Sequence, residues 1–71
     1  MINTNKLKGR IVEKGLTQGD VAKALDLATP TISQKINNVR AMSLHEAFEI
    51  AELLDIPDSQ FREYFFKNEI A

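Results

Sequence analysis

The sequence predicts an all-α protein, a compact five-helix bundle with a helix-turn-helix at its centre. No stretch of the chain alternates between apolar and polar residues with a period of two, so no half-buried strand is expected. Residues 17–40 contain two short helical patterns separated by three residues, which is the spacing of a helix-turn-helix. Helical patterns also precede and follow this stretch. Because 71 residues allow one core, we expect a single domain over residues 1–71, with the motif at about residues 17–38.

The first helix is predicted over residues 4–14. Thr4 or Asn5 supplies a side chain that can cap its N-terminus, and Gly15 follows its end, where a left-handed residue is favoured. Its inner face carries two apolar residues at helical spacing, Leu7 and Ile11.

The first helix of the motif begins after Thr17, whose hydroxyl is a suitable N-terminal cap. One face of this helix is set by four residues at helical spacing: Gln18, Val21, Ala22 and Leu25. Residues 26–28 form the turn. The second helix starts with Thr29 as its cap and Pro30 as its first helical residue, where a missing N–H costs nothing. Its predicted buried face consists of Ile32, Ile36 and Val39.

A long helix is predicted from Ser43 to Asp55. Ser43 and Glu46 have the S-x-x-E spacing of a capping box. The inward residues of this helix share helical spacing: Leu44, Ala47, Phe48, Ala51 and Leu54. Pro57 and Asp58 then stop and restart the chain. The last helix presents one aromatic stripe, made of Phe61, Tyr64 and Phe65.

The chain resembles the Cro/repressor (XRE) family of helix-turn-helix DNA-binding proteins of phages and bacteria. The likeness covers about residues 5–66 and is carried by Leu16, Thr17, Gln18, Ala22, Leu27, Ile32, Ile36 and Asn37. It implies a lambda-repressor-like DNA-binding domain that acts as a transcriptional regulator, such as a phage or prophage repressor. Two positions depart from the family pattern. Asp26 stands where a turn glycine is usual, which costs about 1 kcal/mol in the left-handed region. Pro30 offers no donor where relatives often carry a polar side chain that reads bases.

Composition argues against several other classes of protein. The chain has no cysteine, hence neither a disulfide nor a thiolate metal site. No apolar run approaches the roughly 18 residues of a membrane span, and the N-terminus lacks the apolar core of a signal peptide. His45 and Glu49 are too few ligands for a specific metal site. We therefore expect a cytoplasmic binding protein, not an enzyme, with no cofactor, no small-molecule ligand and no membrane partner.

Charge is distributed unevenly along the chain, although the net charge is only −1. Residues 1–40 carry seven Lys or Arg and three acids, a balance of +4, whereas residues 41–71 carry two cations and seven acids, a balance of −5. This asymmetry would orient the N-terminal half towards phosphate. The alternative is that both sets are ordinary solvated helix faces.

The second motif helix has a polar, uncharged ridge opposite Ile32 and Ile36, as a rotation of about 100° per residue indicates. Glutamine can pair with adenine, and Thr or Pro carbons can contact a thymine methyl. The predicted base-reading residues are Thr29, Pro30, Thr31, Ser33, Gln34 and Asn37. Phosphate contacts require backbone N–H groups and cations at the rim. The predicted phosphate contacts are Thr17 and Gln18, as the resemblance implies, with Lys35, Asn38 and Arg40.

The expected partner is a double-stranded DNA operator, bound by a homodimer that forms in solution or only on DNA. One short helix contacts only about four or five base pairs, so specificity usually requires two copies on neighbouring half-sites. Phe66 is predicted about 140° from Phe61 and near solvent, which makes Phe66 and Ile70 the candidate dimer contacts. The loop around Val39–Met42 is the alternative location.

A second function fits the same sequence. A protein-interaction module, such as an antirepressor or adaptor, could keep the helical fold without binding DNA. Pro30, Asp26 and the overall acidity of the chain favour this alternative.

Overall fold

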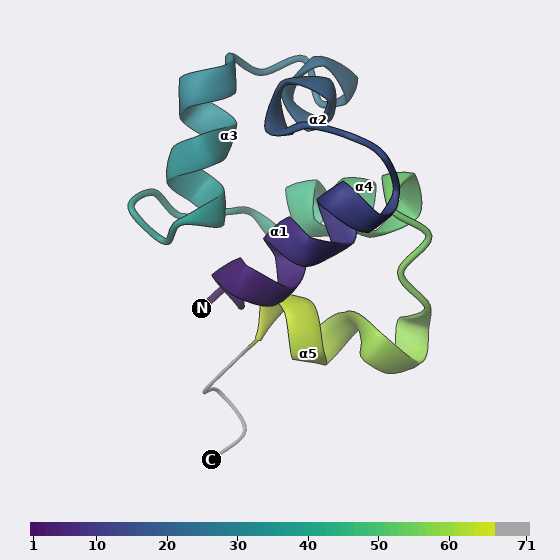
Figure 1. The fold of residues 1–71 in the computed structure, drawn as a ribbon. Coiled ribbons are helices and arrows are strands. Elements are labelled where there is room, and N and C mark those ends of the chain that lie inside the picture. The colour runs from purple at the N-terminus through teal and green to yellow at the C-terminus, as the bar shows by residue number, and fades with distance from the viewer. Residues whose placement is uncertain (67–71) are drawn as a thin grey trace.

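The computed structural model describes residues 1–66 and contains five α-helices, which confirms the predicted all-α bundle (Figure 1). The helices are α1 (Thr4–Glu13), α2 (Gln18–Ala24), α3 (Thr29–Ile36), α4 (Leu44–Leu53) and α5 (Phe61–Phe65), with a short 3-10 helix, η1 (Asp58–Gln60), before α5. The helix-turn-helix of α2 and α3 lies at the top of Figure 1, and α5 lies at the bottom. None of the helices described is long and apolar enough to cross a membrane.

Two capping boxes fix the starts of α2 and α4; the box at Ser43 and the Thr17 cap were predicted, whereas the reciprocal bond from Asp20 was not. Thr17 Oγ1 accepts a hydrogen bond from the Asp20 N–H at 3.1 Å, and the Asp20 carboxylate accepts from the Thr17 N–H at 2.8 Å. Ser43 and Glu46 form the same pair of bonds at the start of α4. Each box satisfies two backbone donors that a helix N-terminus would otherwise leave unpaired.

The N-caps of α1 and α3 differ from the prediction. Asn3, not Thr4 or Asn5, caps α1, because its Oδ1 accepts from the Lys6 N–H. The N-cap of α3 is Ala28, not Thr29, since Ala28 has an extended backbone and its carbonyl accepts the first helical bond from the Ile32 N–H. α3 therefore begins without a side-chain cap.

The first four helices end in the same way. Each is followed by a residue in the left-handed region, at φ between 52° and 74°: Gly15, Asp26, Asn38 and Asp55. The next residue donates its N–H to a carbonyl five positions earlier, in the Schellman pattern: Leu16 to Ile11, Leu27 to Ala22, Val39 to Gln34 and Ile56 to Ala51. Asp26 thus occupies the conformation that glycine usually adopts, as the sequence predicted.

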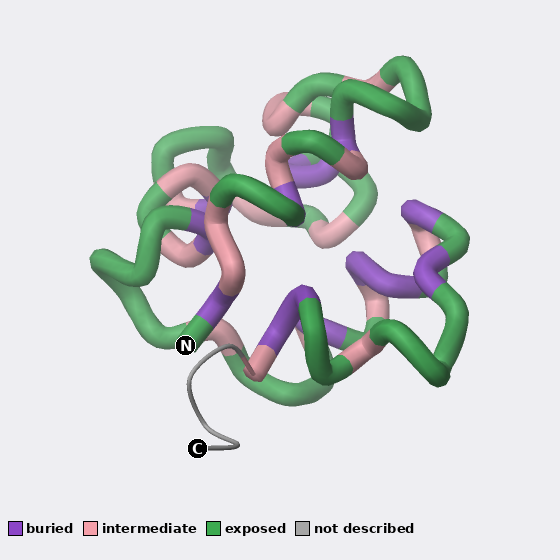
Figure 2. Tube along the Cα trace, turned by 60° about the horizontal axis from the view of Figure 1, so that its bottom comes forward, coloured by how far each residue is buried: buried purple, intermediate pink, exposed green. Residues whose placement is uncertain are grey.

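The core is built from apolar residues of all five α-helices, with Ile2 from the N-terminal segment and Leu54 and Ile56 from the segment after α4. The largest completely buried side chains are Leu7, Val21, Ile32, Ile36, Ile50 and Leu54. In Figure 2 the buried positions alternate with exposed ones along the tube, as expected for amphipathic helices. The predicted inward positions Leu7, Ile11, Ile32 and Ile36 are confirmed.

Three residues predicted to be buried are exposed. Val39 is 74% exposed, because α3 ends at Ile36 and the left-handed residue Asn38 turns the chain away from the core. Leu44 and Phe48 are each 54% exposed, since α4 buries a neighbouring face and the five-residue α5 covers only part of this one.

Candidate nucleic-acid interface

The N-termini of α2 and α3 lie next to each other. A methyl group placed at Gly19, in the first turn of α2, would be 3.5 Å from Thr17 Oγ1 and 3.7 Å from Thr29 Oγ1. The start of one helix therefore faces the start of the other. Backbone N–H groups at a helix N-terminus favour an anion such as phosphate, so the predicted phosphate contact at Gln18 lies close to the predicted base-reading residues.

Several of the predicted base-reading residues are exposed, and their side chains form no hydrogen bond within residues 1–66. Thr29, Pro30 and Gln34 are exposed, and Thr31 is half-buried. Within residues 1–66, the side chains of Thr29, Thr31 and Gln34 form no hydrogen bond. Their donors and acceptors are thus available to a partner, without first having to break an internal contact.

Ser33 and Asn37 are partly engaged with each other. The Asn37 Nδ2 donates to the Ser33 carbonyl at 2.8 Å and lies 3.4 Å from Ser33 Oγ. This bond holds the Asn37 side chain against the last turn of α3. The side-chain oxygen, Oδ1, has no partner within the described residues. Asn37 can therefore still accept a hydrogen bond from a partner, but part of its donor capacity is already used.

Lys35 does not behave as the free cation that was predicted. Its ammonium donates to both carboxylate oxygens of Glu46, at 2.7 Å and 2.6 Å. The two side chains are only 13% and 16% exposed, so the pair is largely removed from water. Lys35 therefore ties α3 to the start of α4, which corrects its assignment as a phosphate contact.

The pKa of Glu46 is held below its ordinary value. Burial by itself raises the pKa. The hydrogen bond from Lys35 and the bond from the Ser43 backbone together lower the pKa by more than burial raises it. Glu46 is therefore ionised at neutral pH, where it serves both the ion pair and the capping box.

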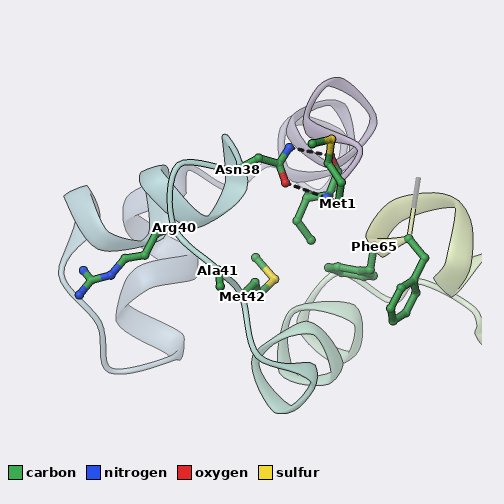
Figure 3. Close-up of a pocket in the computed structure, with 8 residues that line it drawn as sticks. Met1, Asn38, Arg40, Ala41, Met42 and Phe65 are labelled. Carbon is green, nitrogen blue, oxygen red and sulfur yellow. Dashed lines mark hydrogen bonds between the residues drawn. The ribbon is translucent and has the colours of Figure 1, made fainter. Parts of the chain in front are cut away.

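Asn38 is also occupied inside the protein. Its Oδ1 accepts from the Ile2 N–H at 2.8 Å, and its Nδ2 donates to the Ile2 carbonyl at 2.9 Å (Figure 3). The same Nδ2 lies 3.2 Å from Thr4 Oγ1, which in turn donates to the Ile36 carbonyl at 2.8 Å. Asn38 joins the N-terminal segment to the end of α3, which corrects its assignment as a phosphate contact.

Arg40 is exposed and has no ion pair among residues 1–66. In Figure 3 its side chain points away from Met42 and Phe65. Its backbone is fixed, because the N–H groups of Val39 and Arg40 both donate to the Gln34 carbonyl. A guanidinium held just after α3 and directed outward suits a phosphate contact.

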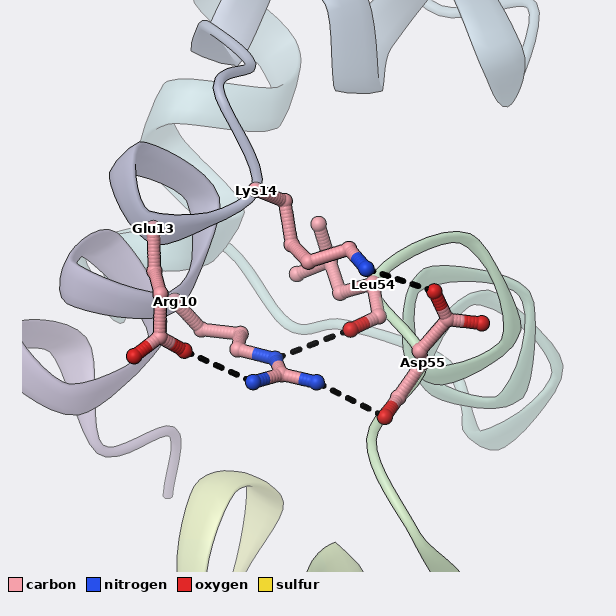
Figure 4. A network of polar contacts seen from close by, with 5 residues as sticks. All are labelled: Arg10, Glu13, Lys14, Leu54 and Asp55. Atoms are coloured by element: carbon pink, nitrogen blue, oxygen red, sulfur yellow. Dashed lines mark hydrogen bonds and ion pairs between the residues drawn. The ribbon is translucent and has the colours of Figure 1, made fainter.

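A network that sequence reasoning missed occupies two further cations of the N-terminal half (Figure 4). Arg10 donates to the carbonyls of Leu54 and Asp55 at 2.9 Å and 2.8 Å, and it pairs with Glu13 at 2.7 Å. Lys14 pairs with the Asp55 carboxylate at 2.6 Å, and this bond lowers the pKa of Asp55. The network satisfies carbonyls at the end of α4 and joins it to α1.

The positive charge available to a partner is therefore smaller than the sequence suggests. Among the seven cations of residues 1–40, four pair with acids: Lys6, Arg10, Lys14 and Lys35. Those without an ion pair in the described part of the chain are Lys8, Lys23 and Arg40.

The candidate dimer contacts are placed differently from the prediction. Phe66 is half-buried and packs against the core, with its ring centroid 5.8 Å from that of Phe61. The predicted exposure was wrong because Phe66 packs against the hydrophobic core, a contact that the helical rotation within α5 does not report. Ile70 lies outside the described residues.

His45 is exposed, with Nε2 3.2 Å from the Glu49 carboxylate. Across residues 1–66, no three His, Asp or Glu side chains gather as a set of metal ligands.

Comparison with known proteins assigns a family but no activity. A family profile described as "Protein of unknown function (DUF739)" matches residues 2–68. No curated protein and no solved structure matches the chain.

Proposed function

This chain belongs to the DUF739 family, and we propose that it is a sequence-specific, double-stranded DNA-binding protein that regulates transcription, most similar in role to phage or prophage Cro-like repressors. In this proposal α3 enters the major groove and α2 lies across the adjacent backbone. A protein that binds DNA in this way would work in the cytoplasm of its host and would require no cofactor.

One observation carries the proposal. The exposed side of α3 presents Thr29, Thr31 and Gln34, whose side chains form no hydrogen bond among residues 1–66, and Thr29 lies beside the N-terminus of α2. This side of α3 is uncharged, so its groups can approach base edges without the cost of desolvating a charge.

The phosphate contacts in this proposal are fewer than the sequence alone suggested. The backbone at Gln18 and the guanidinium of Arg40 would hold the DNA backbone on the two sides of α3. Lys35 and Asn38 support this arrangement from inside the protein. With so few cations, binding to random DNA should be weak and should depend only modestly on salt.

The second candidate function is protein interaction without DNA. The exposed apolar side chains of Leu44 and Phe48 favour it, because such a group commonly marks a protein contact. The same residues are compatible with a DNA-binding dimer, so they do not separate the two functions by themselves.

Selection of bound duplexes from a random library, at low salt, tests the proposal. We expect enrichment of a short motif, repeated in two half-sites about one helical turn apart. Absence of any enriched motif, together with no retardation of random duplex in a gel, would contradict DNA binding and favour the protein-interaction function.

A further inference from the structure

The accessible side chains of α3 are all neutral. The residues of α3 and its C-cap that are exposed or half-buried, apart from Lys35, are Thr29, Pro30, Thr31, Ser33, Gln34 and Asn37. Lys35 is the one charged residue of α3, and its ammonium donates to both carboxylate oxygens of Glu46. The Lys35 side chain is only 13% exposed. A partner of α3 therefore meets amide, hydroxyl and apolar groups but no free cation on this helix.

The lack of a free cation on α3 bears on which bases it can read. Guanine is most often read by Arg or Lys, which donates to O6 and N7 in the major groove. An A·T pair is read differently, because an amide both donates to N6 and accepts at N7 of adenine, and an apolar group contacts the thymine methyl. Gln34 has an exposed amide that forms no hydrogen bond within residues 1–66. The chemistry of α3 thus favours A·T pairs over G·C pairs.

An exposed apolar side chain lies just beyond α3. Val39 is 74% exposed, although valine is usually a buried residue. Its N–H donates to the Gln34 carbonyl at 2.9 Å, and the preceding residue, Asn38, is bonded to Ile2. The backbone that carries the Val39 side chain is therefore fixed next to the last turn of α3. A branched apolar group held beside a base-reading helix can contact a thymine methyl.

We propose that the operator half-site of this protein consists mainly of A·T pairs, with Gln34 reading an adenine and Val39 contacting a thymine methyl. The reading of A·T pairs rests on the proposed function, because the same surface of α3 is used. It adds the class of base pair and the atoms that are read. Arg40, which follows Val39, is directed outward and serves the DNA backbone, so it does not supply the guanine contact that α3 lacks.

Selection of bound duplexes from a random library by the whole chain gives the first test. We expect A·T pairs at most of the roughly four or five base pairs of each half-site. A motif dominated by G·C pairs would overturn the proposed A·T readout and leave the proposed DNA binding intact. Recovery of no motif would overturn both.

Base analogues in a selected duplex test the two contacts atom by atom. Uracil in place of the contacted thymine removes only the methyl group and should weaken binding about fourfold, as loss of one buried methyl does. Replacement of the contacted adenine by 7-deazaadenine removes the N7 acceptor and should weaken binding about fivefold or more. The matched control is 7-deazaguanine at a guanine of the same duplex, which should have no effect. Binding that is insensitive to uracil at every thymine would overturn the methyl contact.

Variants then assign each atom to its residue. Val39→Ala should bind the thymine and uracil duplexes about equally. Val12→Ala is the matched control, because Val12 lies on α1 and is equally exposed, and it should keep the wild-type preference. Gln34→Ala should lose the sensitivity to 7-deazaadenine but keep the sensitivity to uracil. All three side chains are exposed, so these variants should fold normally. Full uracil sensitivity in Val39→Ala, or full 7-deazaadenine sensitivity in Gln34→Ala, would overturn the corresponding assignment.

Discussion

Two groups of polar side chains on and just after α3 are in different states. The side chains of Thr31 and Gln34 form no hydrogen bond within residues 1–66. Lys35, by contrast, is paired with Glu46, and Asn38, just beyond the helix, is bonded to Ile2. The first group is available to a partner, whereas the second holds α3 in place.

This difference shows that residue type does not distinguish a binding residue from a supporting one. Lysine and asparagine are common phosphate contacts, and both were predicted to serve in that role. Their partners here come from distant segments, Glu46 eleven residues away and Ile2 thirty-six residues away. Substitutions in these two groups should therefore separate stability from the proposed DNA recognition.

The largest expected effect is on stability, at the ion pair between Lys35 of α3 and Glu46 of α4. Glu46→Ala should lower the free energy of unfolding by about 2–3 kcal/mol, because it removes a helix cap and leaves Lys35 partly buried without its partner. Urea denaturation followed by circular dichroism measures this change. A loss below about 0.5 kcal/mol would mean that the pair does not hold α3 to α4.

The same ion pair predicts a pH dependence. Because the pKa of Glu46 is lowered in the folded protein, its contribution is fully present above its ordinary value of 4.5 and is lost as the pH falls through the folded-state pKa. Glu46→Gln should therefore reduce the acid-induced part of the stability loss. Parallel stability curves for the two proteins below pH 4.5 would contradict this assignment.

A substitution on the exposed side of α3 should weaken recognition of the operator sequence. Gln34→Ala should cost about 1–3 kcal/mol of binding to the selected operator and relax the preference at one base pair, with little effect on unfolding. Competition binding with single-base operator variants measures this. Gln60→Ala is the matched control, since Gln60 is an exposed glutamine of η1. Equal losses on operator and random duplex would remove Gln34 from base reading.

Asn38 allows the supporting role to be tested directly. Asn38→Gly keeps a residue suited to the φ of 63° but removes the side-chain bonds to Ile2, so it should lower stability by about 1–2 kcal/mol. The slope of binding against salt, measured on folded protein, should not change. A slope lower in magnitude by about one would restore Asn38 as a phosphate contact.

Arg40→Ala should give the smallest effect on stability. In contrast to Asn38→Gly, it should weaken DNA binding while leaving the fold intact. Stability should change by less than about 0.5 kcal/mol, because the side chain is exposed and forms no ion pair in the described region. Binding to all duplexes should weaken, and the salt slope should fall in magnitude by about one. Fluorescence anisotropy at several salt concentrations measures both quantities.

Local sequence patterns predicted most of the fold. The cap at Thr17, the capping box at Ser43 and the core positions Ile32 and Ile36 depend on residues three or four apart, which a helix brings together by its own geometry. The errors at Val39 and Phe66 have different causes. Val39 lies beyond the left-handed residue Asn38, where the rotation of about 100° per residue no longer applies. Phe66 packs against the core, a contact that rotation within α5 does not report.

The candidate interface was less predictable than the fold. Its exposed ridge follows from helical rotation alone, so Gln34 was placed correctly on the outer side of α3. The roles of Lys35, Asn38 and Arg10 depend on contacts between segments far apart in the chain. No spacing rule within one helix reports such contacts, and charge counting treats paired and unpaired cations alike.

The link between the N-terminal segment and α5 has a consequence for synthesis of the protein. The Asn3 N–H donates to the Tyr64 carbonyl at 2.8 Å, and Ile2 is bonded to Asn38. Asn3 is synthesised long before Tyr64, so it can acquire this partner only after α5 has been made. The N-terminal segment can therefore bond to Asn38 at the end of α3 before it can bond to α5.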